Sequence, residues 1–328
     1  MAFYKMKEGY AESMEYRRLG RSGLRLSALS LGFWQNFGEG ASKESARSIV
    51  TAALDGGITS FDLANNYGPP AGAAEEMFGY LYRSMLRPLR DEIVVATKAG
   101  YPAWAGPYGD GGSRKYLVAS CDRSLRAMGL DYVDIFYSHR YDPNTPLEET
   151  MAALDYIVRS GRAIYVALSK YPADVLPRAV EILRSLGTPC LAHQVQYSML
   201  ARQNEPLFPL HKELGVGCVT FSPLAQGQLT DRYAAGIPAD SRASRGESLK
   251  AGVVEENLPK VKALAEIAAE RGESLAQLAL AWQLQSGNVD SVIIGASRPE
   301  QVTDNLKAVA AAPISEEHQQ QIGSILNK

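Results

Sequence analysis

Four side chains that can donate, accept or hold a proton stand at or just beyond the ends of apolar stretches of the sequence. Asp62 lies near the end of one such stretch and Tyr67 follows it by five residues, while Lys98 and His139 end the next two stretches. If these stretches are parallel strands of one barrel, their carboxyl ends meet at a common mouth, where barrel enzymes carry out their chemistry. A carboxylate, a phenol, an ammonium and an imidazole at one mouth would suit general acid–base catalysis.

Each of the four residues also has a purely structural interpretation. An aspartate at a strand end commonly caps a helix, and a tyrosine before a glycine commonly opens a turn. A lysine or a histidine after an apolar run commonly marks the return of the chain to solvent. All four interpretations would have to hold together to remove the site, so the order and positions of Asp62, Tyr67, Lys98 and His139 favour catalysis.

The elements that would position these residues alternate between apolar strands and amphipathic helices. The strands are apolar throughout, which is typical of parallel strands buried on both faces. The pattern predicts an α/β fold, an eight-stranded parallel (β/α)8 TIM barrel. The expected strands are residues 28–33, 58–64, 93–98, 133–139, 164–169, 191–197, 218–222 and 292–296, and the clearest helices are residues 43–55, 73–85, 115–128, 147–159 and 173–186.

A doubly wound dinucleotide fold is the alternative with the same alternation of strands and helices. Such a fold would place a Gly-x-Gly-x-x-Gly turn after its first strand. The first expected strand leads into residues 32–38, GFWQNFG, and the sequence carries this fingerprint neither there nor elsewhere. The barrel is therefore favoured.

Two further segments depart from a plain barrel. Residues 16–19 and 24–26 flank a turn bounded by glycines and predict a β-hairpin before the first strand. Residues 223–256 form a long loop with little periodicity after the seventh strand, and loops of this length are usually functional. Because the loop leaves its strand at the mouth, we expect it to fold over a ligand bound there.

The composition bounds the class of protein. The chain has 328 residues, 46% of them hydrophobic, and a formal net charge of −2. We expect one domain across residues 1–328, with residues 1–14 as a flexible leader. The near-neutral charge gives no reason to expect nucleic acid or an anionic membrane as a partner. Without a signal peptide, a spanning run or metal-type cysteine spacing, the sequence predicts a cytoplasmic protein with reduced thiols.

The arrangement resembles the aldo-keto reductases, and Asp62, Tyr67, Lys98 and His139 match the catalytic tetrad of that family. The resemblance implies that Tyr67 protonates the substrate oxygen, that His139 hydrogen-bonds the carbonyl, and that Asp62 orients Lys98. It also implies that the hairpin plugs the amino-terminal end of the barrel. An ammonium about 4 Å from the phenol would favour the phenolate by roughly 4 kcal/mol at an effective dielectric constant of about 20, so Lys98 is expected to lower the pKa of Tyr67.

The resemblance further implies a nicotinamide cofactor. Ser169 and Gln194 match positions that hold the carboxamide, and Phe221 matches the aromatic position that stacks on the nicotinamide ring. Lys170 stands where the family often has asparagine, which leaves the second carboxamide contact open. For Gln194 and Phe221, filling of the barrel remains the structural alternative. Further cofactor contacts are expected from Trp34, Asp62, Lys170, Ser222, Pro223, Leu224 and Gly227.

The expectation of NADPH rather than NADH rests on positive charge around the adenosine 2′-phosphate. The segment after the eighth strand resembles the family's adenosine-phosphate segment and opens a helix, whose N-terminus favours anions. Arginine forks suit a phosphate monoester. The expected contacts are Ser297, Arg298, Gln301 and Asn305 in that segment, with Arg232 and Arg242 in the long loop.

Longer stretches narrow the resemblance. Residues 106–117 and 133–140 look like the bacterial L-glyceraldehyde 3-phosphate reductase group, which is associated with methylglyoxal reduction and is close to the potassium-channel β subunits. Those subunits typically carry asparagine at the position of His139, so the resemblance implies an efficient enzyme. Related proteins form tetramers or octamers, and we expect a homo-oligomer.

The expected substrate is a small aldehyde or ketone. Trp34, Tyr101 and Trp104 would wall its pocket together with Tyr67 and His139. Two other functions stay open: a redox-sensing or regulatory module that binds NADPH with slow turnover, and an NAD-dependent polyol dehydrogenase. The histidine of the tetrad disfavours the first, and the arginines expected around the 2′-phosphate disfavour the second.

Overall fold

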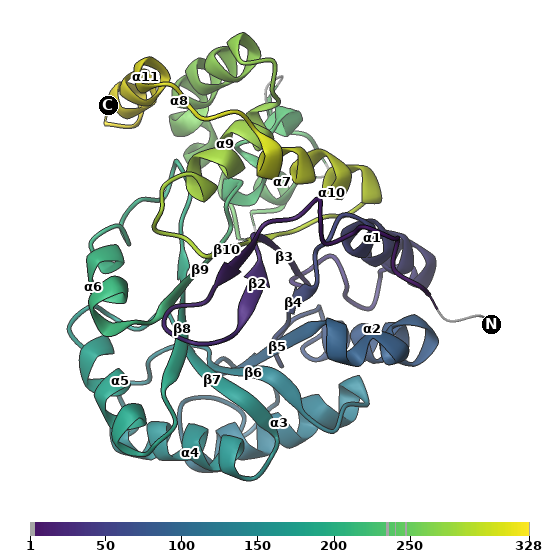
Figure 1. The fold of residues 1–328 in the computed structure, drawn as a ribbon, viewed down its shortest axis with the longest axis vertical. Coiled ribbons are helices and arrows are strands. Elements are labelled where there is room, and N and C mark those ends of the chain that lie inside the picture. The colour runs from purple at the N-terminus through teal and green to yellow at the C-terminus, as the bar shows by residue number, and fades with distance from the viewer. Residues whose placement is uncertain (1–3, 234–235, 240, 247, 328) are drawn as a thin grey trace.

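A computed structural model describes residues 4–233, 236–239, 241–246 and 248–327. Within these ranges, eight parallel strands close a barrel in the order β10-β3-β4-β5-β6-β7-β8-β9, and helices surround it (Figure 1). The predicted (β/α)8 barrel is thus confirmed. The barrel strands are β3 Leu29–Gly32, β4 Ser60–Asp62, β5 Val94–Ala99, β6 Val133–Ser138, β7 Ala163–Ser169, β8 Cys190–Gln196, β9 Gly217–Phe221 and β10 Ser291–Ile294.

The helices follow the amphipathic stretches of the sequence. Helix α1 begins after Ser42, whose hydroxyl accepts a hydrogen bond from the backbone N–H of Ser45, and ends at Gly56. The second expected helix is α-helical only to Leu81 and continues as a π-helix, Tyr82–Leu86. The helices are α1 Lys43–Asp55, α2 Ala73–Leu81, α3 Arg114–Met128, α4 Leu147–Arg159, α5 Leu176–Ser185, α6 Leu207–Leu214, α7 Arg242–Arg245, α8 Ala251–Glu270, α9 Leu275–Leu284, α10 Pro299–Leu306 and α11 Glu316–Leu326.

The predicted hairpin closes the amino-terminal end of the barrel. Strands β1, Tyr16–Arg18, and β2, Arg25–Ser27, pair antiparallel and lie across the barrel in Figure 1. Leu19 and Leu26 are buried among side chains that point into the barrel interior. Gly20 makes this approach possible, because its φ is +56° and a Cβ there would lie 2.6 Å from the carbonyl oxygen of Gly215.

The segment 4–14, expected to be a flexible leader, packs against the barrel instead. The hydroxyl of Tyr4 hydrogen-bonds Asp55 at the end of α1, and that of Tyr10 donates to Glu92 at 3.2 Å. Met14 belongs to the main hydrophobic core and is 5% exposed. The apolar side chains of segment 4–14 follow neither a helical nor a strand period, so the sequence suggested a flexible segment.

The long loop after β9 is shorter than expected, and its described residues include short helical turns. Short 3-10 turns form at Ala225–Gly227 and Asp231–Tyr233, α7 follows, and α8 already starts at Ala251 rather than beyond Glu256. The loop and the start of α8 share a small core of their own, made by the buried residues Tyr233, Ala243, Leu249 and Val254. Because these apolar residues are widely spaced, they leave no periodic signal.

Two other expectations concern the cysteines and the absence of a membrane-spanning helix. Cys121, Cys190 and Cys218 are all buried and form no disulfide with one another, as expected for reduced structural thiols. In the described part of the chain, none of the helices has both the length and the apolar character needed to cross a membrane.

Candidate active site

Lys98 is the centre of the candidate site. It lies on β5 with no exposed side-chain surface, and its Nζ lies 2.6 Å from Asp62 Oδ2 at the end of β4. The same nitrogen donates to the carbonyl oxygen of Leu63 at 2.7 Å and to the hydroxyl oxygen of Tyr67 at 3.3 Å. These three contacts use the full donor capacity of an ammonium. The structure therefore joins Asp62, Lys98 and Tyr67 into one continuous chain of hydrogen bonds.

In this hydrogen-bonded group, the pKa of Tyr67 shifts in the opposite direction to the one expected. Burial raises the pKa of Tyr67 well above its usual value, and the charge of Asp62 acts in the same direction. Burial also lowers the pKa of Lys98, while attraction to Asp62 opposes that change. Because the carboxylate lies closer to Lys98 than the phenol does, the pair presents little net positive charge to Tyr67. The phenol thus keeps its proton near neutral pH, and the expected lowering of its pKa is wrong for this state.

His139 stands directly after β6 and faces two tyrosines. Its ring centre lies 5.7 Å from that of Tyr67 and 4.8 Å from that of Tyr101, both in edge-on geometry. Burial lowers the pKa of His139 well below its usual value, and Lys98, Lys170 and Arg140 add to the effect. Its Nδ1 is buried without a hydrogen-bond partner among the described residues. A neutral imidazole with spare hydrogen-bonding capacity therefore lies beside the phenol.

Backbone strain gathers at the same mouth. Among the described residues, the non-glycine positions with positive φ are Gln35, Lys170, Ser222, Ala225 and Gln226. All of them lie in loops that follow the barrel strands β3, β7 and β9. Such conformations cost about 1–3 kcal/mol each and are typical of ligand-binding and active sites.

The expected carboxamide positions lie next to the tetrad. Ser169 ends β7 and pairs in register with Gln194 of β8. The Ser169 hydroxyl donates a hydrogen bond to the backbone carbonyl oxygen of Gln194 at 3.1 Å. Gln194 Nε2 donates to Asp62 Oδ1 at 2.9 Å, so it reaches the ion pair directly. Phe221 ends β9 and is partly buried, and the Nζ of Lys170 lies 5.2 Å from its ring centre. These residues form one wall of the mouth.

The segment after β10 has the form of an anion site. Arg298 is exposed at the N-terminus of α10, which no side chain caps. Gln301 Oε1 accepts hydrogen bonds from the backbone N–H of Ser297 at 2.8 Å and from its hydroxyl at 3.2 Å. Asn305 is 4% exposed, one turn further along the helix. A guanidinium and the positive end of a helix dipole at one helix start favour a bound phosphate.

The expected cofactor contacts in the loop after β9 differ in their exposure. Arg232 is exposed after the first turn of the long loop, and the side chain of Arg242 lies outside the described part of the structure. Pro223 is buried, while Leu224 and Gly227 are partly buried near β9. The structure thus places the start of this loop beside Phe221, and the expected approach of Arg232 and Arg242 to the 2′-phosphate stays a prediction.

The two expected tryptophans of the substrate wall have different surroundings. Trp34 follows β3 and is 38% exposed. Trp104 packs instead against helix α3, with its ring centre 5.0 Å from that of Tyr116 and the guanidinium of Arg123 4.4 Å from its ring. Its expected contact with substrate stays a prediction. Of the aromatic residues in the loop after β5, Tyr101 contacts His139 and Trp104 contacts Tyr116.

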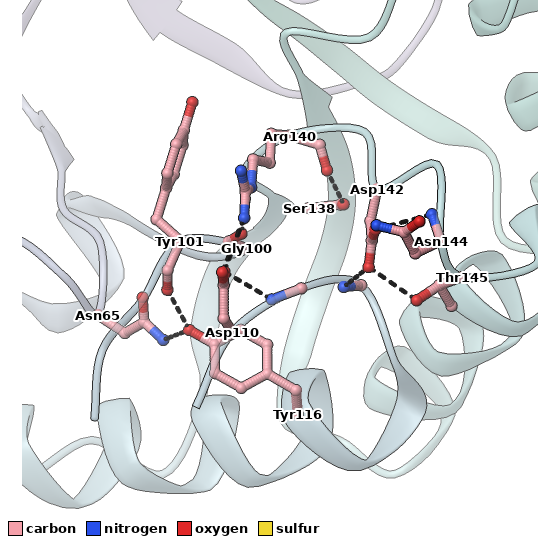
Figure 2. Close-up of polar contacts among 12 residues, drawn as sticks. Asn65, Gly100, Tyr101, Asp110, Tyr116, Ser138, Arg140, Asp142, Asn144 and Thr145 are labelled. Carbon is pink, nitrogen blue, oxygen red and sulfur yellow. Dashed lines mark hydrogen bonds and ion pairs between the residues drawn. The ribbon is translucent and has the colours of Figure 1, made fainter. Parts of the chain in front are cut away.

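Arg140 was missed by the sequence analysis. Figure 2 shows it beside Tyr101, where its Nε donates to the carbonyl oxygen of Gly100 at 2.6 Å and its Nη2 contacts both carboxylate oxygens of Asp110, at 2.8 and 3.0 Å. The hydroxyl of Tyr116 also donates to the carbonyl oxygen of Tyr101, at 2.5 Å. These bonds fix the loop after β5. The one sequence signal was that an arginine directly follows His139.

A closed parallel barrel with proton-transferring side chains at the carboxyl ends of its strands defines a barrel enzyme. Comparison with known families identifies which one: the Aldo/keto reductase family model matches residues 28–327. The chain belongs to the aldo/keto reductase family and is an oxidoreductase of that kind, as its sequence had suggested. Members of this family typically use a nicotinamide cofactor, NADH or NADPH.

Individual relatives agree with this assignment. The chain is 51% identical over 316 residues to the L-glyceraldehyde 3-phosphate reductase of Escherichia coli K12, covering 94% of this chain and 91% of that protein. It is 40% identical over 311 residues to a probable voltage-gated potassium channel subunit beta of Arabidopsis thaliana, covering 92% and 93%. Among solved structures, an aldo-keto reductase from Bacillus halodurans in its holo form matches with a TM-score of 0.75 and 28% identity, covering 95% and 96%.

Proposed function

We propose that this protein reduces small aldehydes and ketones to alcohols with NADPH, and that L-glyceraldehyde 3-phosphate is its preferred substrate. Methylglyoxal is a further candidate substrate. The observation that carries the proposal is the hydrogen-bonded chain from Asp62 through Lys98 to Tyr67, with His139 beside it. Bound NADPH would supply the hydride that the carbonyl carbon accepts.

The residues of the chain supply the proton and hold the substrate. Tyr67 keeps its proton near neutral pH because burial raises its pKa, so it can give that proton to the carbonyl oxygen as the C=O double bond becomes a single bond. Lys98 then stabilises the phenolate that remains, since its Nζ already lies 3.3 Å from the hydroxyl oxygen. Neutral His139 orients the carbonyl through a hydrogen bond. Asp62 keeps Lys98 charged and in place.

The residues of the mouth fit a nicotinamide dinucleotide. Phe221 offers an aromatic face, Ser169 a hydroxyl and Gln194 an amide. The start of α10 has no side-chain cap and offers the positive end of its dipole. Arg298 at that start supports NADPH, because a guanidinium suits the additional 2′-phosphate. Arg232 and Arg242 would add to this charge from the loop.

The choice of substrate follows the relatives. The E. coli protein that is 51% identical is named for reduction of L-glyceraldehyde 3-phosphate. A slow regulatory subunit is the second candidate, because probable potassium channel β subunits match at about 40% identity. His139 beside Tyr67 supports the enzyme over the regulator, because its ring is neutral and its buried Nδ1 has no hydrogen-bond partner among the described residues.

The test is an assay of NADPH oxidation with purified protein. L-glyceraldehyde 3-phosphate, methylglyoxal and a set of neutral aldehydes would be ranked by kcat/KM, each with NADPH and with NADH. We expect the phosphorylated aldehyde with NADPH to rank first. Tight NADPH binding with negligible turnover of every carbonyl would instead favour the regulatory function. The same preparation would show by gel filtration whether the proposed homo-oligomer exists.

A further inference from the structure

Lys170 occupies an unusual position for a lysine at the mouth of the barrel. It follows β7 directly and adopts a positive φ of 56°. Its Nζ donates to the hydroxyl oxygen of Tyr101 at 3.0 Å and lies 4.7 Å from the centre of that ring. The Nζ also lies 5.2 Å from the ring centre of Phe221. The ammonium thus lies between the wall expected for the nicotinamide and the wall that faces His139.

Lys170 differs from the other cations of the site in that it forms no ion pair with a carboxylate of the described residues. Lys98 is paired with Asp62, and Arg140 is paired with both oxygens of Asp110. Among the residues that the structure describes, no carboxylate forms an ion pair with Lys170, whose contacts are with aromatic rings and a phenol. A cation without a carboxylate at a ligand-binding mouth is suited to an anionic ligand.

The place of this cation relative to His139, which would bind the carbonyl, defines where the anion would be. The ring of Tyr101 joins the two, because its centre lies 4.8 Å from that of His139 while its hydroxyl contacts Lys170. Arg140 also contacts this ring, with its guanidinium carbon 4.7 Å from the ring centre. Figure 2 shows how its bonds to Gly100 and Asp110 fix the loop that carries Tyr101. Tyr101 is therefore a fixed spacer between the carbonyl site and the cation.

We propose that the Lys170 ammonium and the Tyr101 hydroxyl form a subsite for the phosphate of a short phosphorylated aldehyde or ketone. This inference rests on the proposed function and names the part of the substrate that the mouth selects. A phosphate monoester carries about −1.5 to −2 charges at neutral pH. Lys170 would supply a point charge and the Tyr101 hydroxyl a hydrogen-bond donor, while the carbonyl lies at Tyr67 and His139. Arg140 is a positioning residue in this arrangement.

The first test compares glyceraldehyde 3-phosphate with glyceraldehyde, the same compound without its phosphate. In the Lys170→Met variant, the ratio of the two kcat/KM values should fall by about 10- to 100-fold, the size of one charge-assisted hydrogen bond. Lys170→Arg should restore most of the ratio. The matched control is Lys43→Met, because the Nζ of Lys43 also lies 4.7 Å from a tyrosine ring centre, that of Tyr80, but in the outer layer of helices. This control should leave the ratio at the wild-type value.

The second test uses inorganic phosphate at saturating NADPH. Phosphate should inhibit the wild-type protein in competition with glyceraldehyde, and Lys170→Met should lose this inhibition. An equal fall in kcat/KM for both substrates, accompanied by weaker NADPH binding in a fluorescence titration, would overturn the inference and assign Lys170 to the cofactor. If the wild-type protein reduces neither compound, the proposed function fails as well. Turnover of both with an unchanged ratio in Lys170→Met leaves the reductase standing and removes the subsite.

Discussion

Lys98 and Asp62 form a buried ion pair in which both oxygens of the carboxylate are engaged. Lys98 Nζ lies 2.6 Å from Oδ2, and Gln194 Nε2 donates to Oδ1 at 2.9 Å. The pair links strands β4, β5 and β8, which are far apart in the sequence. A buried ion pair of this kind adds little net stability, but removal of one partner leaves the other charge buried and unpaired.

We predict that Asp62→Asn lowers the free energy of unfolding by about 3–5 kcal/mol, because the Lys98 ammonium loses its counter-charge in a fully buried position. The double variant Asp62→Asn/Lys98→Met should regain most of this loss, since neither charge remains. Urea denaturation followed by circular dichroism would measure both variants. An equally unstable double variant would show that the loss comes from packing rather than charge. Both variants should lose turnover.

The proton donor gives a second prediction. Tyr67→Phe should lower kcat by about 10²- to 10⁴-fold, because the phenol proton is the one given to the carbonyl oxygen. NADPH affinity, measured by fluorescence titration, should stay close to the wild-type value. The control is Tyr137→Phe, since Tyr137 is also buried and its ring centre lies 5.7 Å from the Nζ of Lys98. If Tyr67→Phe keeps more than about a tenth of the wild-type kcat, another group donates the proton.

The sequence predicts the barrel, and the closeness of Asp62, Tyr67, Lys98 and His139, because both depend on local patterns. Apolar runs mark the strands, and a polar residue at the end of each run must face the mouth once the strands close. The cations around Tyr101 are different. Lys170 and Arg140 meet this ring through loops whose course depends on bonds between distant residues, such as Arg140 to Asp110. No spacing in the sequence encodes these contacts.

A related limit applies to the pKa of Tyr67. The sequence places a lysine next to a tyrosine, but the direction of the shift depends on burial and on the distance to Asp62. Trp104 illustrates the same limit. Tyr101 and Trp104 belong to one loop, but the first contacts His139 and the second contacts Tyr116. The cofactor and substrate roles of the individual residues stay predictions that the variants described here can test.

Cofactor choice gives a third prediction. Arg298→Ala should raise the Kd of NADPH by about 10- to 100-fold and should change the Kd of NADH much less, because only NADPH carries the 2′-phosphate. Arg298→Lys, which keeps a positive charge at the start of α10, should show a smaller increase. Both constants can be measured by quenching of tryptophan fluorescence. An equal change for the two nucleotides would mean that Arg298 does not contact the 2′-phosphate.

A fourth prediction concerns Glu75, a carboxyl group buried behind the ion pair. Glu75 lies in the first turn of α2 and is 3% exposed, and its Oε1 accepts a hydrogen bond from the hydroxyl of Thr97, the neighbour of Lys98, at 2.5 Å. Burial raises the pKa of Glu75 to about 7, although Thr97 and the charge of Lys98 act in the opposite direction. The sequence shows two adjacent glutamates, Glu75 and Glu76, and gives no sign that one of them is buried.

The raised pKa has a defined effect on stability. Between about pH 4.5 and pH 7 the folded protein binds a proton at Glu75 that the unfolded chain has released, so stability falls as pH rises through this window. The loss from this group amounts to about 3 kcal/mol once pH exceeds 7. Glu75→Gln keeps an acceptor for Thr97 and cannot ionise, so it should remove this part of the decline and be more stable than the wild type at pH 8. Thermal melting of both proteins at pH 5 and pH 8 would measure the difference, with Glu76→Gln, an exposed position on the same helix, as the control. If the wild type and Glu75→Gln lose the same stability between these two pH values, Glu75 is already ionised in the folded protein at pH 5.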